Sequence, residues 1–144
     1  MGRYADLARI IDGIPEQTLI WLSNDDPQAT THNLSVINRI IADAEDIVDD
    51  TLRSRYTLPL PTVSTSVGRI TVSIARHDLY ARRPETPVPV DVVRTYRVAL
   101  DWLEQIQECS KHLGDSLQVD IPDGGGFRIR ASAKKFSDDA LAGY

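Results

Sequence analysis

The sequence lacks the residues and runs that several common protein classes need. Cys109 is the only cysteine in 144 residues, which excludes an intrachain disulfide and a cysteine-rich zinc site. The apolar runs are a few residues long, too short to span a bilayer, so we expect no membrane contact. Arg3, Asp6 and Arg9 interrupt the N-terminus where a signal peptide would be apolar. We therefore expect a soluble, cytoplasmic protein of ordinary domain size.

The sequence also has no excess of positive charge. The formal net charge is −5; residues 1–125 hold 12 Lys/Arg against 19 Asp/Glu, whereas residues 126–144 hold 4 against 2. Because Lys and Arg that neutralise phosphates supply most non-specific affinity for DNA, the acidic body disfavours a regulatory DNA-binding module. The basic end could dock on an acidic neighbour or be a solvated tail, and charge alone favours neither.

No catalytic arrangement can be recognised in the sequence. Three histidines lie in separate expected elements without HExxH-like spacing: His32, His77 and His112. For His77 a packed or surface position is preferred over a role as ligand or base. Cys109 has no paired histidine and is interpreted as a buried or half-buried thiol. The glycine-rich run at residues 122–128 lacks the lysine and following helix of a phosphate-binding loop, and is interpreted as a turn.

Two acidic groups raise a metal hypothesis. The run at residues 24–26 is followed by Pro27 and lacks the glycine and final glutamate of a calcium loop, which favours a turn with capping carboxylates. Asp43, Asp46 and Asp50 share one helix face, but no Glu-x-x-His partner accompanies them, so a solvated or arginine-facing surface is preferred. We expect no enzymatic activity and no cofactor; the alternative is a small metal-dependent helical enzyme using these three aspartates.

The strongest periodic pattern runs from Asn33 to Arg55. Its apolar residues recur with the period of one helix stripe: Val36, Ile37, Ile40, Ile41, Ala44, Ile47, Val48 and Leu52. Asn33 is expected to cap the helix. The opposite face is expected to carry the polar residues Arg39, Asp43, Glu45, Asp46, Asp49 and Asp50. A helix of about 20 residues is about 30 Å long, so other helices must pack on the stripe.

The whole pattern predicts a mainly α fold, a helical bundle of three long and two short helices. The other four expected helices cover, approximately, residues 4–12, 15–23, 64–82 and 91–112. Gly13 is expected in the left-handed conformation that ends the first helix, and Asp91 is expected to cap the last. Serines, threonines and Gly68 make the helix over residues 64–82 weak by intrinsic preference, so packing must hold it.

Beyond the helices, the sequence predicts a C-terminal β-hairpin and an extended tail. Apolar and polar residues alternate within residues 114–130 around the turn-forming run PDGGG. A lone hairpin is marginal in water, so it must lie on the helices or on a partner. The chain is therefore divided into a helical part, residues 1–113, and a C-terminal part, residues 114–144, that makes contacts with partners. The expected interface residues are Phe127, Arg128, Arg130, Lys134, Lys135, Phe136, Leu141 and Tyr144.

Several short motifs occur in a distinctive order along the chain. They are YADLARI near the start, Ile47-Val48-Asp49 through Arg55-Tyr56, Leu58-Pro59-Leu60, Ile74 through Tyr80 with Arg83-Pro84, Arg94-Thr95-Tyr96 through Glu104, and Phe136 through Leu141-Ala142-Gly143-Tyr144. In their order and spacing, the sequence resembles the neck-protein family of Mu-like phages and prophages.

The resemblance implies a structural virion protein, not an enzyme. Residues 1–113 would then be a connector domain, assembled as a homo-oligomeric ring, dodecameric by resemblance, between head and tail. The implied partners are the portal protein and a tail-terminator or other neck protein, with packaged DNA passing through without specific binding. The implied location is the neck of the virion, and the host cytoplasm during assembly. An acidic body suits this role because it repels passing phosphates.

Overall fold

A computed structural model describes residues 2–108 and 113 of the chain. Within these residues the protein forms five α-helices and no strand: α1 (Leu7–Ile11), α2 (Glu16–Ser23), α3 (Leu34–Leu52), α4 (Thr65–Ala81) and α5 (Val90–Gln107). The prediction of a mainly helical fold with three long and two short helices is therefore confirmed. The predicted hairpin at residues 114–130, the tail after it and the division at residue 113 concern a part of the chain outside the described residues.

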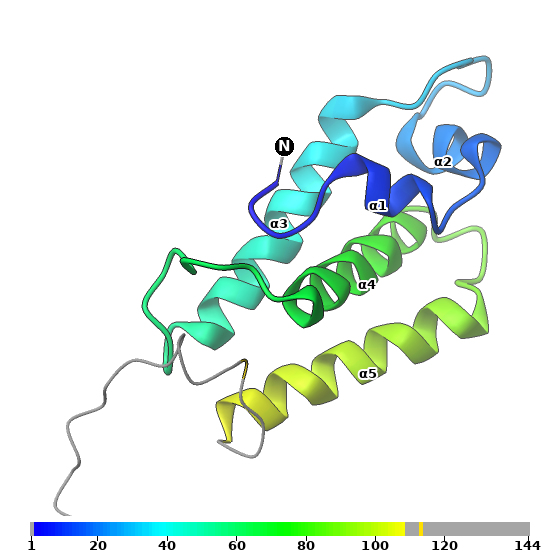
Figure 1. Cartoon of the computed structure of the whole chain (residues 1–144). Helices are drawn as coiled ribbons and strands as arrows, with labels where there is room; N and C mark the ends of the chain where they lie inside the picture. Colours follow the sequence, from blue (N-terminus) through cyan, green and yellow to red (C-terminus); the bar gives the residue numbers. More distant parts are fainter. Residues whose placement is uncertain (1, 109–112, 114–144) are drawn as a thin grey trace, which may run out of the picture.

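Helix α4 lies at the centre of the bundle. It packs between α3 and α5, and α1 and α2 also contact it, as Figure 1 shows. The buried side chains of α4 include Val67, Ile70, Ile74 and Leu79. The helix that the sequence marks as weakest in propensity is thus the one that packing supports most, as expected.

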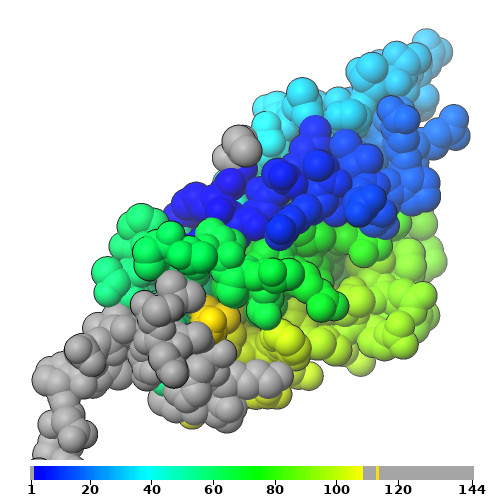
Figure 2. All heavy atoms as spheres, viewed as in Figure 1, coloured from blue at the N-terminus to red at the C-terminus, as the bar shows by residue number. Residues whose placement is uncertain are grey.

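Gly68 explains part of that weak propensity. It is buried on α4, close to Tyr4 and Arg9 of the N-terminal segment. Figure 2 shows the atoms of this segment lying against those of α4. A Cβ atom at this position would collide with the Arg9 guanidinium and lie 3.1 Å from the carbonyl oxygen of Tyr4. The glycine therefore lowers helix propensity but allows the N-terminal segment to pack closely on α4.

Local sequence signals set several helix boundaries correctly. The Asn33 side chain accepts from the backbone N–H groups of Ser35 (3.1 Å) and Val36 (3.3 Å), so the predicted cap of α3 is confirmed. Ser64 caps α4 in the same way, through the N–H of Val67 at 3.3 Å. Each cap satisfies donors that the first helical turn leaves without intrahelical partners.

Two predictions about helix ends need correction. Gly13 directly follows Asp12, the C-cap of α1, as predicted, but it is not left-handed. A Cβ there would lie 3.0 Å from Nη1 of Arg76, and Nη2 of Arg76 donates to the Gly13 carbonyl at 2.8 Å. Space for an arginine, and not a positive φ, is what the glycine provides. Asp91 is not the cap of α5, because Pro89 occupies that position and its ring fixes φ near the helical value. Asp91 lies in the first turn instead, 3.0 Å from Arg94.

The stripe of α3 also departs from its prediction. Ile47 was expected inward but is 44% exposed. Glu45 and Asp49 were expected on the solvated face but are only 3% and 4% exposed. The apolar face of α3 is therefore narrower than its isoleucines suggest, and a buried polar strip runs beside it.

The link between α3 and α4 packs on the helical bundle. Leu60 is buried and Leu58 half-buried against the core, and the Leu58–Pro59 peptide bond is cis. Tyr56 is buried as well, and its hydroxyl accepts from the N–H of Leu113 at 3.0 Å, close to where α5 ends.

Within the described part of the chain, no helix is long and apolar enough to cross a membrane.

Candidate partner interface

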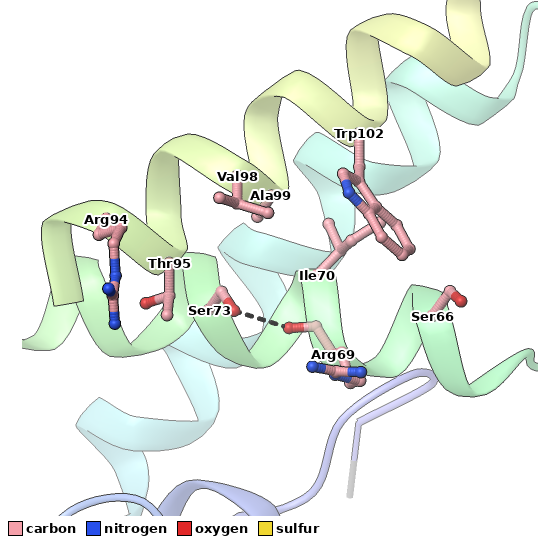
Figure 3. A pocket seen from close by; sticks show the side chains of 9 residues that line it. All are labelled: Ser66, Arg69, Ile70, Ser73, Arg94, Thr95, Val98, Ala99 and Trp102. Carbon is pink, nitrogen blue, oxygen red and sulfur yellow. Dashed lines mark hydrogen bonds between the residues drawn. The ribbon is translucent and has the colours of Figure 1, made fainter. Parts of the chain in front are cut away.

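An open groove separates the outer edges of α4 and α5. It has a volume of about 180 Å³, and α4 and α5 together supply its lining: Ser66, Arg69, Ile70, Ser73, Arg94, Thr95, Val98, Ala99 and Trp102. The two helices run in opposite directions, so Ser66 lies near Trp102 at one end, and Ser73 lies near Thr95 and Arg94 at the other (Figure 3). The groove stays open because small side chains face each other across it.

The floor of this groove is apolar. Ile70 and Ala99 are buried beneath it, Trp102 is half-buried, and Val98 is 48% exposed. An exposed apolar depression with polar residues around it is typical of a surface that binds another protein segment. Its volume is below the roughly 300–1,000 Å³ of small-molecule sites, and is better suited to one or two apolar side chains.

The rim of the groove is positively charged, although the protein as a whole is acidic. Arg69 extends from α4 and Arg94 from α5, and both are exposed. Arg94 pairs with Asp91 at 3.0 Å, and both side chains are largely exposed; among the described residues no ion pair involves Arg69. Guanidinium groups at these positions can bind carboxylates through paired N–H donors. The groove therefore combines an apolar floor with two exposed guanidinium groups on its rim.

A second cluster joins the N-terminal segment to α3. Arg3 donates to Asp46 at 2.7 Å and also to Asp49. The backbone N–H of Tyr4 donates to Glu45 at 2.7 Å, and its hydroxyl donates to Asp49. Glu45 and Asp49 are thus buried with charged or polar partners, as buried carboxylates require. This cluster holds the start of the chain against the bundle.

The cluster makes the Tyr4 hydroxyl an unusually weak acid. Burial raises the pKa of its hydroxyl well above the ordinary value of 10.0, and the hydrogen bond to Asp49 raises it further. Above pH 10 the unfolded chain loses this proton while the folded chain keeps it, so stability falls as pH rises.

We expect Tyr4→Phe to change this alkaline behaviour. At pH 7 the variant loses the hydrogen bond to Asp49, and with it about 1 kcal/mol of stability. Between about pH 10 and 12 its stability should decline less steeply than that of the wild type, because one tyrosine with a raised pKa is gone. Urea unfolding at a series of pH values measures both effects. Parallel declines in the two proteins would contradict the assignment.

The aspartates of the metal alternative have separate surroundings. Asp46 pairs with Arg3, Asp50 lies 3.7 Å from Arg53, and Asp43 is exposed. Within the described residues, no three His, Cys, Asp or Glu side chains lie together as a metal site would require. The preferred interpretation of a face that meets arginines is confirmed for Asp46.

The acidic loop and His77 have structural roles. Asp26 accepts from the N–H of Gln28 at 2.9 Å, as a capping carboxylate does, and Asp25 accepts from Arg82 at 2.6 and 2.7 Å.

The ring of His77 stacks on Tyr96 of α5, with centroids 3.9 Å apart, so the packed interpretation of this histidine is confirmed.

A second hollow lies beside α2. It measures about 410 Å³, is more polar than the groove, and is lined by Gln17, Ile20, Trp21, Asp26, Pro27, Ala29 and Thr30. Arg83 lies over the Trp21 ring, 5.3 Å from its centroid, and donates to carbonyl oxygens at the end of α2. Arg83, which follows α4 in the chain, therefore attaches the end of α2 to α4 beside this hollow.

The predicted interface residues, from Phe127 to Tyr144, all lie outside the described residues. The groove itself was missed by sequence reasoning. Its only signal was the series Ser66, Arg69, Ser73 at steps of three and four, which places small and basic side chains on one face of α4. The sequence does not reveal that α5 presents Val98 and Trp102 opposite this face.

The fold and the groove define a small helical protein with a surface suited to binding a protein segment. The sequence profile of the family described as "Bacteriophage Mu, Gp36" matches residues 4–131, which include all five helices. The chain therefore belongs to this phage protein family, and the resemblance to proteins of Mu-like phages is confirmed. No curated protein matches the chain.

Proposed function

We propose that this phage protein is a head–tail connector, a structural subunit that assembles as a ring in the neck of the virion between portal and tail. Membership of the Bacteriophage Mu Gp36 family supports a phage role. The observation that carries the proposal is the exposed apolar groove between α4 and α5, because an assembly subunit needs a surface that a neighbour can cover.

An exposed groove suits assembly of a ring. A ring forms when one patch of each subunit binds a different patch of the next and the rotation closes, as in a dodecamer. The groove is one such patch, and the predicted interface residues at 127–144 supply a second, distant in sequence. The acidic body disfavours adhesion of DNA that passes through such a ring.

The proposed role is tested by restoring the joining of heads to tails. Heads filled with DNA but assembled without this protein should fail to join tails, and adding the purified protein should restore joining. The repaired particles should contain many copies of the chain each. Efficient tail joining in its absence would exclude a connector role. Elemental analysis showing a stoichiometric metal would favour the metal-dependent alternative.

Deleting Phe136–Tyr144 should abolish assembly and docking while leaving the helical circular dichroism spectrum unchanged, because the five helices end before this segment. Light scattering after gel filtration measures the assembly. Replacing the same nine residues with a Gly/Ser sequence of equal length is the matched control, and should fail equally if their side chains matter. Normal assembly of the truncated protein would show that the tail is not an interface.

A further inference from the structure

We propose that the groove between α4 and α5 binds residues 136–141 of a second copy of this chain, Phe-Ser-Asp-Asp-Ala-Leu. The inference rests on the proposed ring and deepens it, because it names the two surfaces that join one subunit to the next. Three properties of the groove and the segment support the pairing: charge, apolar content and spacing.

Charge is the first property. Asp138 and Asp139 are the only acidic residues among the last 19 residues of the chain, where basic residues otherwise prevail. The groove shows the reverse, since Arg69 and Arg94 stand on its rim in a protein with a net charge of −5. The exposed bond from Arg94 to Asp91 is easily exchanged for another carboxylate, because surface ion pairs contribute little. Each aspartate can therefore meet one arginine.

Apolar content is the second property. Phe136 and Leu141 flank the two aspartates. The groove offers an apolar floor of Ile70, Val98 and Ala99 between its charged rims, with a volume of about 180 Å³. That volume can hold one large apolar side chain completely and part of a second one. A short segment with two apolar residues would fill it in this way.

Spacing is the third property. Neighbouring side chains of an extended segment point to opposite sides. Asp138 and Asp139 are adjacent in the sequence, so in an extended segment one would face Arg69 on α4 and the other Arg94 on α5, across the groove.

The chain is long enough to reach a neighbour. Leu113 is held at the end of the bundle by the Tyr56 hydroxyl, 3.0 Å from its N–H. The 23 residue steps from Leu113 to Phe136 can span up to about 75 Å. A connection of this length permits binding to the groove of a neighbouring subunit. The need of a ring for two different patches favours that groove over the subunit's own.

Reciprocal charge reversal in the full-length protein tests the pairing. One variant carries Arg69→Glu and Arg94→Glu; the other carries Asp138→Arg and Asp139→Arg. Each alone should lose at least nine-tenths of its assembled fraction by light scattering while keeping the wild-type circular dichroism spectrum. The control pair Arg39→Glu and Arg97→Glu makes the same change of charge at exposed positions outside the groove, and should assemble normally.

Mixing the two reversed variants should restore the ring, because each acidic groove then receives a basic tail and each basic groove an acidic one. Such an alternating ring needs an even number of subunits, as a dodecamer has. Combining all four substitutions in one chain should also restore assembly.

If wild-type particles contain an even number of copies, rescue in the combined chain without rescue in the mixture would place the contact within one subunit and overturn the proposal. The proposal would also be overturned if either reversed variant assembled like the wild type, or if assembly were lost and neither the mixture nor the combined chain restored it. Neither result would exclude the ring itself. A wild-type protein that stays monomeric at all concentrations, and on purified portal, would overturn both the contact and the ring.

Discussion

Ile74→Ala should lower the free energy of unfolding by about 2–5 kcal/mol. Ile74 is fully buried at the middle of α4, the helix that contacts all four others. Removing its side-chain methyl and methylene groups loses burial and leaves a cavity that neighbours on several helices cannot all fill. Because α4 is weak in intrinsic helix propensity, little local preference is left to compensate for the lost packing.

Ile47→Ala is the matched control for this prediction. It makes the same chemical change on a long helix, but Ile47 is 44% exposed, so the expected loss is below about 1 kcal/mol. Chemical denaturation at pH 7 measures both values. Equal losses would show that α4 is not the packing centre of the bundle.

Asp49→Ala should lower the free energy of unfolding by about 2–3 kcal/mol. Asp49 is 4% exposed and accepts from both the Arg3 guanidinium and the Tyr4 hydroxyl. Its removal leaves a buried hydroxyl without an acceptor and withdraws one of the anions that hold Arg3. The N-terminal segment should then detach more easily, which proteolysis near Arg3 would detect.

Asp43→Ala is the control for this second prediction, since Asp43 lies on the same helix and is exposed. The expected change is within about 0.5 kcal/mol. The sequence alone treats these aspartates as equivalent members of one acidic face. A similar loss in both variants would contradict the buried cluster and favour a general effect of helix charge.

The fold was predictable from the sequence where local patterns decide it. Apolar periodicity located the three long helices, and Asn33 marked the start of α3 correctly, since a cap depends only on the first helical turn. The prediction that Asp91 caps α5 was wrong because the helix begins earlier, with Pro89 at the N-cap. Ile47 misled because a stripe of isoleucines does not reveal how wide the contact of α3 with its neighbours is.

The buried polar cluster and the groove were not predictable in this way. Glu45 and Asp49 meet partners more than 40 residues earlier in the chain, and no local pattern links them. The groove depends on which faces of α4 and α5 meet, because Ser66 and Ser73 leave space only where α5 crosses them. Both features arise from tertiary packing between elements that are individually ordinary.

The proposed ring is tested most directly by electron cryomicroscopy of the neck of intact virions. The account predicts a closed ring of this five-helix bundle between portal and tail, with additional density in the groove between α4 and α5 of every copy. A neck that contains no copy of the bundle would contradict it.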